Sequence, residues 1–179
     1  MVNVRGPILR IRDGVATDLP FLEQMLVQAF FWSPDLPRRP LEQLRREPEF
    51  AKLLADWGRS GDRAVVAMED GARVGAAWFR LWTPERHSYG FVDARTPELG
   101  LAVAAAHRRR GLGRGLLRAL VAAARSQGHP ALSLSVDPAN PARRLYEAEG
   151  FRKSGESGTS WTLLLPLAVQ WSLGAEDSR

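Results

Sequence analysis

The stretch "HRRRGLGRGLLRAL" at residues 107–120 contains three consecutive arginines, glycines at alternate positions and then apolar residues at helical spacing. It follows "ELGLAV" at 98–103, which alternates in the way typical of a strand. Glycines allow the main chain to approach a ligand closely, and the N-terminus of a helix attracts anions. This order of strand, basic glycine turn and helix predicts a site where backbone N–H groups converge on a phosphate.

Two common phosphate-binding motifs do not match this stretch. A dinucleotide fingerprint would need a third glycine where the chain has Leu116. A P-loop would need a lysine, and none occurs between Lys52 and Lys153. The remaining interpretation is a short backbone cradle, for which a pyrophosphate is the expected ligand.

Other patterns along the chain predict the remaining elements. The alternating run over 62–82 predicts a hairpin, because its Asp70-Gly71 pair favours a type I′ turn. Strand 98–103 has Leu99, Leu101 and Val103 on one face and small residues beside Glu98 on the other. The remaining predictions are a strand at 8–14, helices beginning at Thr17 or Asp18 and at 41–57 with an interruption at Pro48, a short strand at 89–92, a helix over 113–127, a strand at 131–136, a helix over 140–150 with Asn140 as N-cap, and strands at 151–154 and 160–167.

These elements predict a mixed-sheet α/β domain with strand-helix units in its second half. The length of 179 residues favours a single domain over 1–179, with a core from about 8 to 167 and a partly frayed tail at 168–179. No apolar run is long enough to span a bilayer and no secretory signal pattern is present, so a cytoplasmic protein that binds no membrane is expected.

The amino-acid composition argues against several kinds of functional site. The chain has no cysteine and its three histidines are scattered, so disulfides, a thiol nucleophile and a metal site are not expected. The net charge of +5 favours an anionic ligand or a nucleic acid, although biased codon usage would also explain the abundant arginine. A nucleic-acid interface is disfavoured because no aromatic residue for base stacking lies between Val92 and Tyr146.

"RRRGLG" at 108–113 matches the R/Q-x-x-G-x-G/A signature of the GNAT superfamily of acyl-CoA N-acyltransferases. "ELGLAV" is similar to the family's splayed central strand, and "SLSVDPANPARRLYEAEGF" at 133–151 resembles its second motif. The resemblance is close over 98–152 and looser over 8–167. It implies a mixed, mostly antiparallel sheet of six to seven strands with a splayed central pair and about four flanking helices.

The resemblance also implies acetyl-CoA as cosubstrate. Main-chain groups of Leu101, Ala102 and Val103 would pair with its pantetheine arm, and Asn140 would contact that arm. Arg143 and Arg144 are candidate partners of the adenosine or its phosphates. The pyrophosphate would be wrapped by the loop residues Arg108, Arg109, Arg110, Gly111, Leu112, Gly113, Arg114 and Gly115.

Two side chains are candidates for catalysis. Glu98 lies where Gly100 and Ala102 leave room for substrate and could deprotonate an amine directly or through water, or it is only a surface or ion-paired carboxylate. Tyr146 should face inward from its helix, near the sulfur in the resembling family. Because a phenol is a weaker acid than a thiol, it would either donate a hydrogen bond to the thiolate or have a lowered pKa; the alternative is a core tyrosine.

The predicted function is therefore transfer of an acetyl group from acetyl-CoA to a primary amine by direct attack in a ternary complex. The alternative is a catalytically silent CoA-binding regulatory module of the same fold. The acceptor, a small molecule or a peptide, stays open, and a homodimer is one state that the resemblance allows. The aromatic residues could line an acceptor pocket or simply fill the core: Phe30, Phe31, Trp32, Trp57, Trp78 and Trp82.

Overall fold

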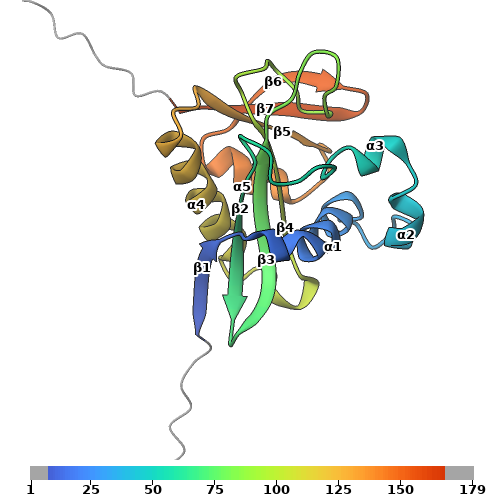
Figure 1. Ribbon diagram of the computed structural model, residues 1–179, viewed down its shortest axis with the longest axis vertical. Coiled ribbons are helices and arrows are strands. Elements are labelled where there is room, and N and C mark those ends of the chain that lie inside the picture. Colours follow the sequence, from blue (N-terminus) through green and yellow to red (C-terminus); the bar gives the residue numbers. More distant parts are fainter. Residues whose placement is uncertain (1–7, 168–179) are drawn as a thin grey trace, which may run out of the picture.

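The computed structural model describes residues 8–167, and a seven-stranded sheet forms its centre (Figure 1). The strand order is β1-β2-β3-β4-β5-β7-β6, and every neighbouring pair is antiparallel except β4 with β5. This confirms the predicted mixed, mostly antiparallel sheet, while the predicted tail at 168–179 lies outside the described residues. The strands are β1 (Leu9–Asp13), β2 (Arg63–Glu69), β3 (Ala72–Arg80), β4 (Glu98–Val103), β5 (Ala131–Val136), β6 (Arg152–Ser157) and β7 (Ser160–Pro166).

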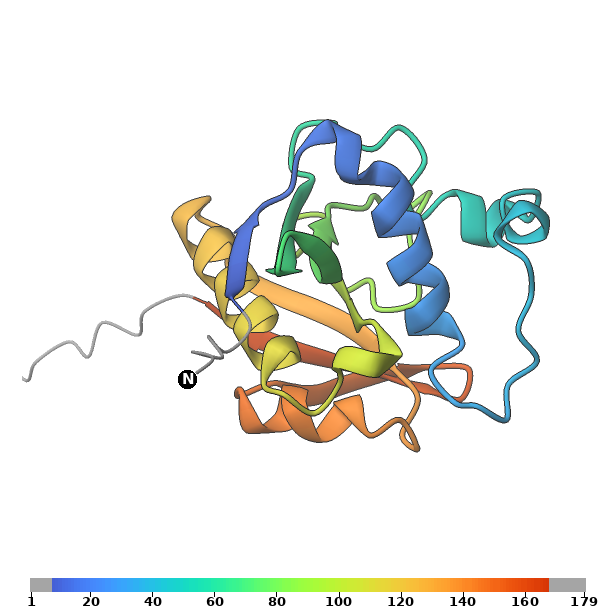
Figure 2. The same cartoon turned by 90° about the horizontal axis from the view of Figure 1, so that it is seen from below.

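Helices cover both faces of the sheet, with α1 on one side and α4 and α5 on the other (Figure 2). Successive β2 residues show the division, because Val65 belongs to the core cluster of α4 and Val66 to that of α1. Within residues 8–167, no helix combines the length and the apolar character needed to cross a membrane. The helices are α1 (Leu19–Phe30), α2 (Leu41–Leu44), α3 (Pro48–Ala51), α4 (Leu112–Ser126) and α5 (Ala142–Ala148).

The hairpin between β2 and β3 forms as predicted. Asp70 has a φ of 48° and Gly71 a φ of 84°, so both central residues adopt the left-handed conformation that a type I′ turn requires. β3 then lies beside β4 with Gly75 paired to Val103 and Arg80 paired to Glu98. This register places the small residues of β3 next to the strand that precedes the glycine turn.

The predicted splay of the central strands is confirmed. β4 pairs with β5 only through Glu98 and Ser133, whereas β5 pairs with β7 along its whole length from Ala131 to Val136. The Ser133 N–H donates to the Pro97 carbonyl at 3.0 Å, which fixes this junction. Beyond it the parallel strands diverge, so the side of β4 facing β5 lacks a strand partner along the rest of its length.

Two predictions about the connecting segments are wrong. The stretch 41–57 contains only the two four-residue helices α2 and α3, separated and followed by turns. The predicted interruption at Pro48 is confirmed, because proline cannot continue the preceding helix and begins a new one. Leu44 and Phe50 are buried as the pattern required. Residues 89–92 form no strand, and the Gly90 N–H donates instead to the side chain of Glu98.

The expectation that Gly100 leaves room for substrate is confirmed only in part, because the Trp78 indole of β3 occupies the space where a Cβ on Gly100 would lie. A Cβ placed on Gly100 would lie 2.6 Å from the Trp78 ring. Glycine is therefore required here to let the indole pack against the β4 main chain.

Gly100→Ala is expected to destabilise the fold by about 1–3 kcal/mol through this overlap. Gly155→Ala is the matched control, since it also lies in a strand and its Cβ would meet nothing closer than 3.9 Å. Urea unfolding of both variants measures the difference. Equal stability of the two variants would show that Trp78 can move aside without cost.

Candidate active site

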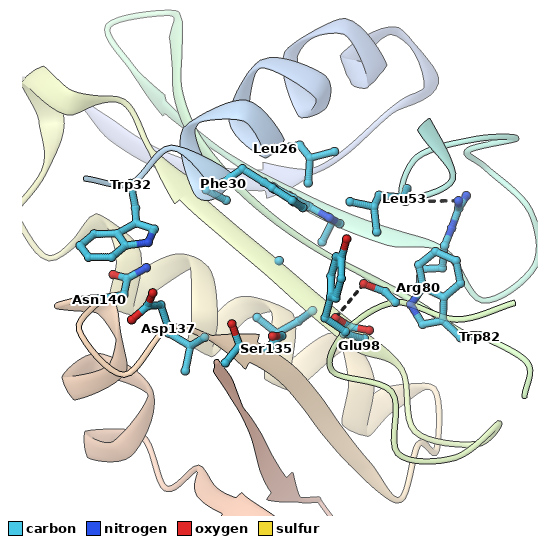
Figure 3. Close-up of a pocket in the computed structure, with 18 of the residues that line it drawn as sticks. Leu26, Phe30, Trp32, Leu53, Arg80, Trp82, Glu98, Ser135, Asp137 and Asn140 are labelled. Carbon is cyan, nitrogen blue, oxygen red and sulfur yellow. Dashed lines mark hydrogen bonds between the residues drawn. The ribbon is translucent and has the colours of Figure 1, made fainter. Parts of the chain in front are cut away.

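Two adjoining cavities open where β4 and β5 diverge. The first, here called the aromatic cavity, has a volume of about 370 Å³, and the second, the glycine-loop cavity, about 570 Å³. Figure 3 shows the aromatic cavity, with Asp137 and Asn140 at one end, Arg80 and Trp82 at the other, and Glu98 nearer the second end. Both cavities are lined by Ala29, Trp32, Leu99, Gly100, Ser135, Val136 and Asn140.

The glycine loop presents unpaired backbone donors at the start of α4. Arg109 has a φ of 61° and Gly111 a φ of 81°, which turn the main chain sharply before the helix begins at Leu112. The N–H groups from Arg109 to Arg114 have no backbone partner within residues 8–167, whereas the Gly115 N–H donates to the Gly111 carbonyl. Six consecutive free donors at the positive end of a fifteen-residue helix are suited to binding an anion.

The arginines of the loop have separate roles. Arg108 donates to the Val103 carbonyl at 3.0 Å and to Gln28 at 3.2 Å, so it braces the loop against β4 and α1. Arg109 makes no hydrogen bond or ion pair with any of the residues from 8 to 167 and lines the glycine-loop cavity. Arg110 instead turns away to pair with Glu69.

The predicted cofactor residues are only partly brought together. Arg143 donates to Pro138 and pairs with Glu147 at 2.7 Å, and its side chain lines neither cavity. A Cβ on Gly115 would lie 2.9 Å from the terminal methyl of Ile11, and Gly115 lines neither cavity. The predicted residues that do line the glycine-loop cavity are Leu101, Ala102, Val103, Arg108, Arg109, Gly113, Arg114, Asn140 and Tyr146.

Glu98 is held by one carboxylate oxygen and leaves the other unpaired. Its Oε1 accepts hydrogen bonds from the Gly90 N–H at 2.9 Å and the Ser88 hydroxyl at 3.1 Å. Its Oε2 is buried and has no partner within residues 8–167, and no ion pair reaches Glu98 from that part of the chain. Burial raises the pKa of Glu98 to about 7, although the two hydrogen bonds act in the opposite direction.

Ser88 and Gly90 were not predicted as site residues. Gly90 approaches β5 so closely that a Cβ would lie 2.6 Å from the Leu134 main chain and 2.9 Å from Glu98 Oε1. The turn-rich composition of this segment gave no signal of that contact. The segment therefore brings a hydroxyl and an N–H to the predicted base from outside the central motif.

Tyr146 and Asn140 approach the cavities from the other side of the cleft. The Tyr146 ring is 6% exposed, packs edge-on against Phe151 with centroids 5.9 Å apart, and lines the glycine-loop cavity. Burial raises the pKa of Tyr146, so the alternative of a lowered pKa is wrong. Asn140 accepts from the Ala142 N–H at 2.9 Å and lines both cavities. The N-cap of α5 is Pro141, so the helix begins one residue later than predicted.

The aromatic residues divide between the two roles considered for them. Phe30, Trp32, Trp78 and Trp82 line the aromatic cavity, together with Tyr89, which the sequence did not single out. Phe31 and Trp57 instead pack against the core cluster beneath α1. No group of histidine and carboxylate side chains among residues 8–167 is arranged to hold a metal ion.

Ser88→Ala is expected to raise the pKa of Glu98, because it removes a hydrogen bond that stabilises the ionised carboxylate. The shift is expected to be about half a unit to one unit. NMR titration of ¹³C-labelled glutamate carboxyls measures it, with Glu98→Gln identifying the resonance. Ser154→Ala, which removes a hydroxyl on β6, is the control. An unchanged titration would show that Ser88 does not stabilise the carboxylate.

Comparison with known proteins agrees with this geometry. The fold is similar to the PaiA N-acetyltransferase of Thermoplasma acidophilum in complex with coenzyme A (TM-score 0.68, 18% identity, 89% of this chain and 99% of that one). It is also similar to YncA of Salmonella typhimurium with its cofactor acetyl-CoA (TM-score 0.67, 21% identity, 93% and 98% covered).

The ribosomal-protein-S18-alanine N-acetyltransferase of Escherichia coli has the same fold (TM-score 0.63, 19% identity, 93% and 98% covered). No curated protein sequence matches the chain. The model of the Acetyltransferase (GNAT) family matches residues 23–151, which include the cleft, the glycine loop and both candidate catalytic residues. The chain belongs to the GNAT family of acetyltransferases.

Proposed function

We propose that the protein transfers an acetyl group from acetyl-CoA to a primary amine. The observation that carries this proposal is Glu98, a buried carboxylate with one unpaired oxygen, in a cavity that adjoins a loop of unpaired backbone donors. Membership of the GNAT family and the coenzyme A and acetyl-CoA bound to two similar structures support the choice of acyl donor.

The residues of the glycine-loop cavity fit acetyl-CoA. Free N–H groups from Arg109 to Arg114, with the unpaired side chain of Arg109, would hold the pyrophosphate. Main-chain groups of β4 beyond its junction with β5 would pair with the pantetheine arm, and Asn140 would border it. When bound, acetyl-CoA supplies a thioester carbonyl that is open to attack by a neutral amine.

Glu98 is suited to make the amine neutral. A primary amine is largely protonated near pH 7, and its ammonium form cannot attack a carbonyl. A carboxylate with a pKa of about 7 is a stronger base than an ordinary glutamate and is still partly ionised at that pH. Ser88 and Gly90 hold Oε1, so the unpaired Oε2 is the atom that would accept the proton.

Tyr146 is suited to stabilise the departing thiolate by donating a hydrogen bond. Its raised pKa means that the hydroxyl keeps its proton throughout the neutral range. Full proton transfer to a thiolate would be strongly uphill, since the thiol is the stronger acid. Hydrogen-bond donation needs no such transfer and uses the phenol as the structure presents it.

Glu98→Gln is expected to lower kcat/KM for acetyl transfer by about 10²-fold, since it removes the base without changing the shape of the site. In the native protein kcat/KM should rise with pH through about 7, as Glu98 loses its proton, and the variant should lack this rise. Release of free thiol from acetyl-CoA over pH 5–9 measures both. Glu156→Gln, on the distant edge strand β6, is the control.

Tyr146→Phe is expected to lower kcat by about 10- to 100-fold, the cost of losing a hydrogen bond to a charged group. The Kd of acetyl-CoA should change little, because the ring and its packing against Phe151 are kept. Thiol release and calorimetric titration with acetyl-CoA separate the two quantities. An unchanged kcat would remove Tyr146 from the mechanism, and tight binding without turnover by the native protein across a broad amine panel would favour a silent CoA-binding module.

A further inference from the structure

The aromatic cavity has walls that are mostly apolar. Phe30 and Trp32 come from α1 and the segment after it, Trp78 from β3, and Trp82 and Tyr89 from the segment between β3 and β4. The Phe30 and Tyr89 rings meet edge to face with centroids 6.5 Å apart, and both remain about 40% exposed. The aliphatic residues of the lining are Leu26, Ala29, Leu36, Leu53, Leu99 and Val136.

The lining contains three charged side chains, Arg80, Glu98 and Asp137. Arg80 is 2% exposed, pairs with Asp62 through two contacts of 2.9 and 2.6 Å, and donates to the Ala55 carbonyl at 2.7 Å. The Arg80 guanidinium is therefore committed to its neighbours and offers no binding site for an anion. The charged groups of the lining that remain available to a ligand are the carboxylates of Glu98 and Asp137.

The Asp137 carboxylate is only partly satisfied by the chain. Its Oδ1 accepts from the Ala139 N–H at 2.8 Å, and Figure 3 shows the side chain beside Asn140, away from Glu98. Among residues 8–167, no cationic side chain that lines the cavity forms an ion pair with Asp137. Asp137 therefore adds negative potential to the cavity, which attracts cations.

We infer that the acceptor is a primary amine carried on an aromatic or apolar body and without a carboxylate, a class that includes the arylalkylamines. This inference rests on the proposed function and adds the substrate class. The ammonium group would face Glu98, and the body would pack against the aromatic walls. A volume of about 370 Å³ lies in the range of small-molecule sites.

Two other classes of amine fit this cavity poorly. An α-amino acid would bring its carboxylate next to Glu98 with no free cation among the described lining residues, and burying an unpaired charge is costly. An amino sugar would place several hydroxyl groups against walls that are mostly apolar. The first exclusion follows from the absence of a free cation among the described lining residues, and the second from the mostly apolar walls.

The test compares three amines on the full chain saturated with CoA, by calorimetric titration, and with acetyl-CoA, by thiol release. 2-Phenylethylamine is the expected ligand, L-phenylalanine is the same body with a carboxylate, and glucosamine is a polar amine. 2-Phenylethylamine should bind about tenfold or more tightly than either of the other two amines. Its kcat/KM for acetylation should also be about tenfold or more higher than theirs. Equal or stronger binding of either competitor, or no binding of 2-phenylethylamine, would overturn the inference.

The two readouts separate failure of the inference from failure of the proposed function. Thiol release with glucosamine or phenylalanine in preference to 2-phenylethylamine would leave the proposed function intact and overturn the substrate class. Selective binding of 2-phenylethylamine without thiol release from any amine would support the substrate class and contradict the proposed function.

A wall variant links the selectivity to the aromatic cavity. Tyr89→Ala should raise the Kd of 2-phenylethylamine about tenfold, while Tyr89→Phe, which keeps the ring, should bind as the native protein does. Since Tyr89 is 42% exposed, its truncation leaves no buried void. Unchanged binding by Tyr89→Ala would contradict the assignment of this wall to the acceptor.

Discussion

The separation of β4 from β5 is the constraint on which the rest of the molecule depends. The two strands meet at Glu98 and Ser133 and then diverge, so one edge of β4 lies inside the molecule without a strand partner. A buried main chain cannot leave its polar groups unsatisfied without a cost in stability. The fold tolerates this edge because it opens onto cavities that solvent or a ligand can fill, and Glu98 lies where the opening begins.

The two cavities beside this edge have opposite electrostatic character. The glycine-loop cavity is bounded by free backbone donors and by Arg109, whereas the aromatic cavity has Glu98 and Asp137 in its walls. Under the proposed function, such fields would attract an anionic cofactor to the glycine-loop cavity and a cationic acceptor to the aromatic cavity. In that assignment the two reactants would meet at the residues that line both cavities.

The elements governed by local rules were predictable from sequence. The hairpin at Asp70-Gly71, strand β4, the glycine turn and α4 depend on backbone conformation or on the spacing of apolar residues, both of which are visible in a short window. The resemblance to the GNAT family added the splay of the sheet and the candidate roles of Glu98 and Tyr146.

The features that were not predicted depend on contacts between segments that are separated in the sequence. Ser88 and Gly90 reach Glu98 across a turn-rich stretch, and Trp78 occupies the space where a Cβ on Gly100 would lie. The residues after Ala51 form turns in place of the predicted helix, although Leu53 and Leu54 of that pattern are buried. In each case tertiary packing decided the outcome.

The buried pair of Arg80 and Asp62 has an evolutionary consequence. Arg80 is the one cationic residue among the residues from 8 to 167 that line the aromatic cavity. The carboxylate of Asp62, eighteen positions earlier in the chain, neutralises it. Loss of that carboxylate would leave a buried guanidinium in the cavity wall without its counter-ion, still bonded to the Ala55 carbonyl, at a cost in stability of about 3–5 kcal/mol for the unpaired charge. If the cavity holds a cationic acceptor as inferred above, a single substitution at Asp62 would weaken that charge preference, and the lost stability would oppose the change.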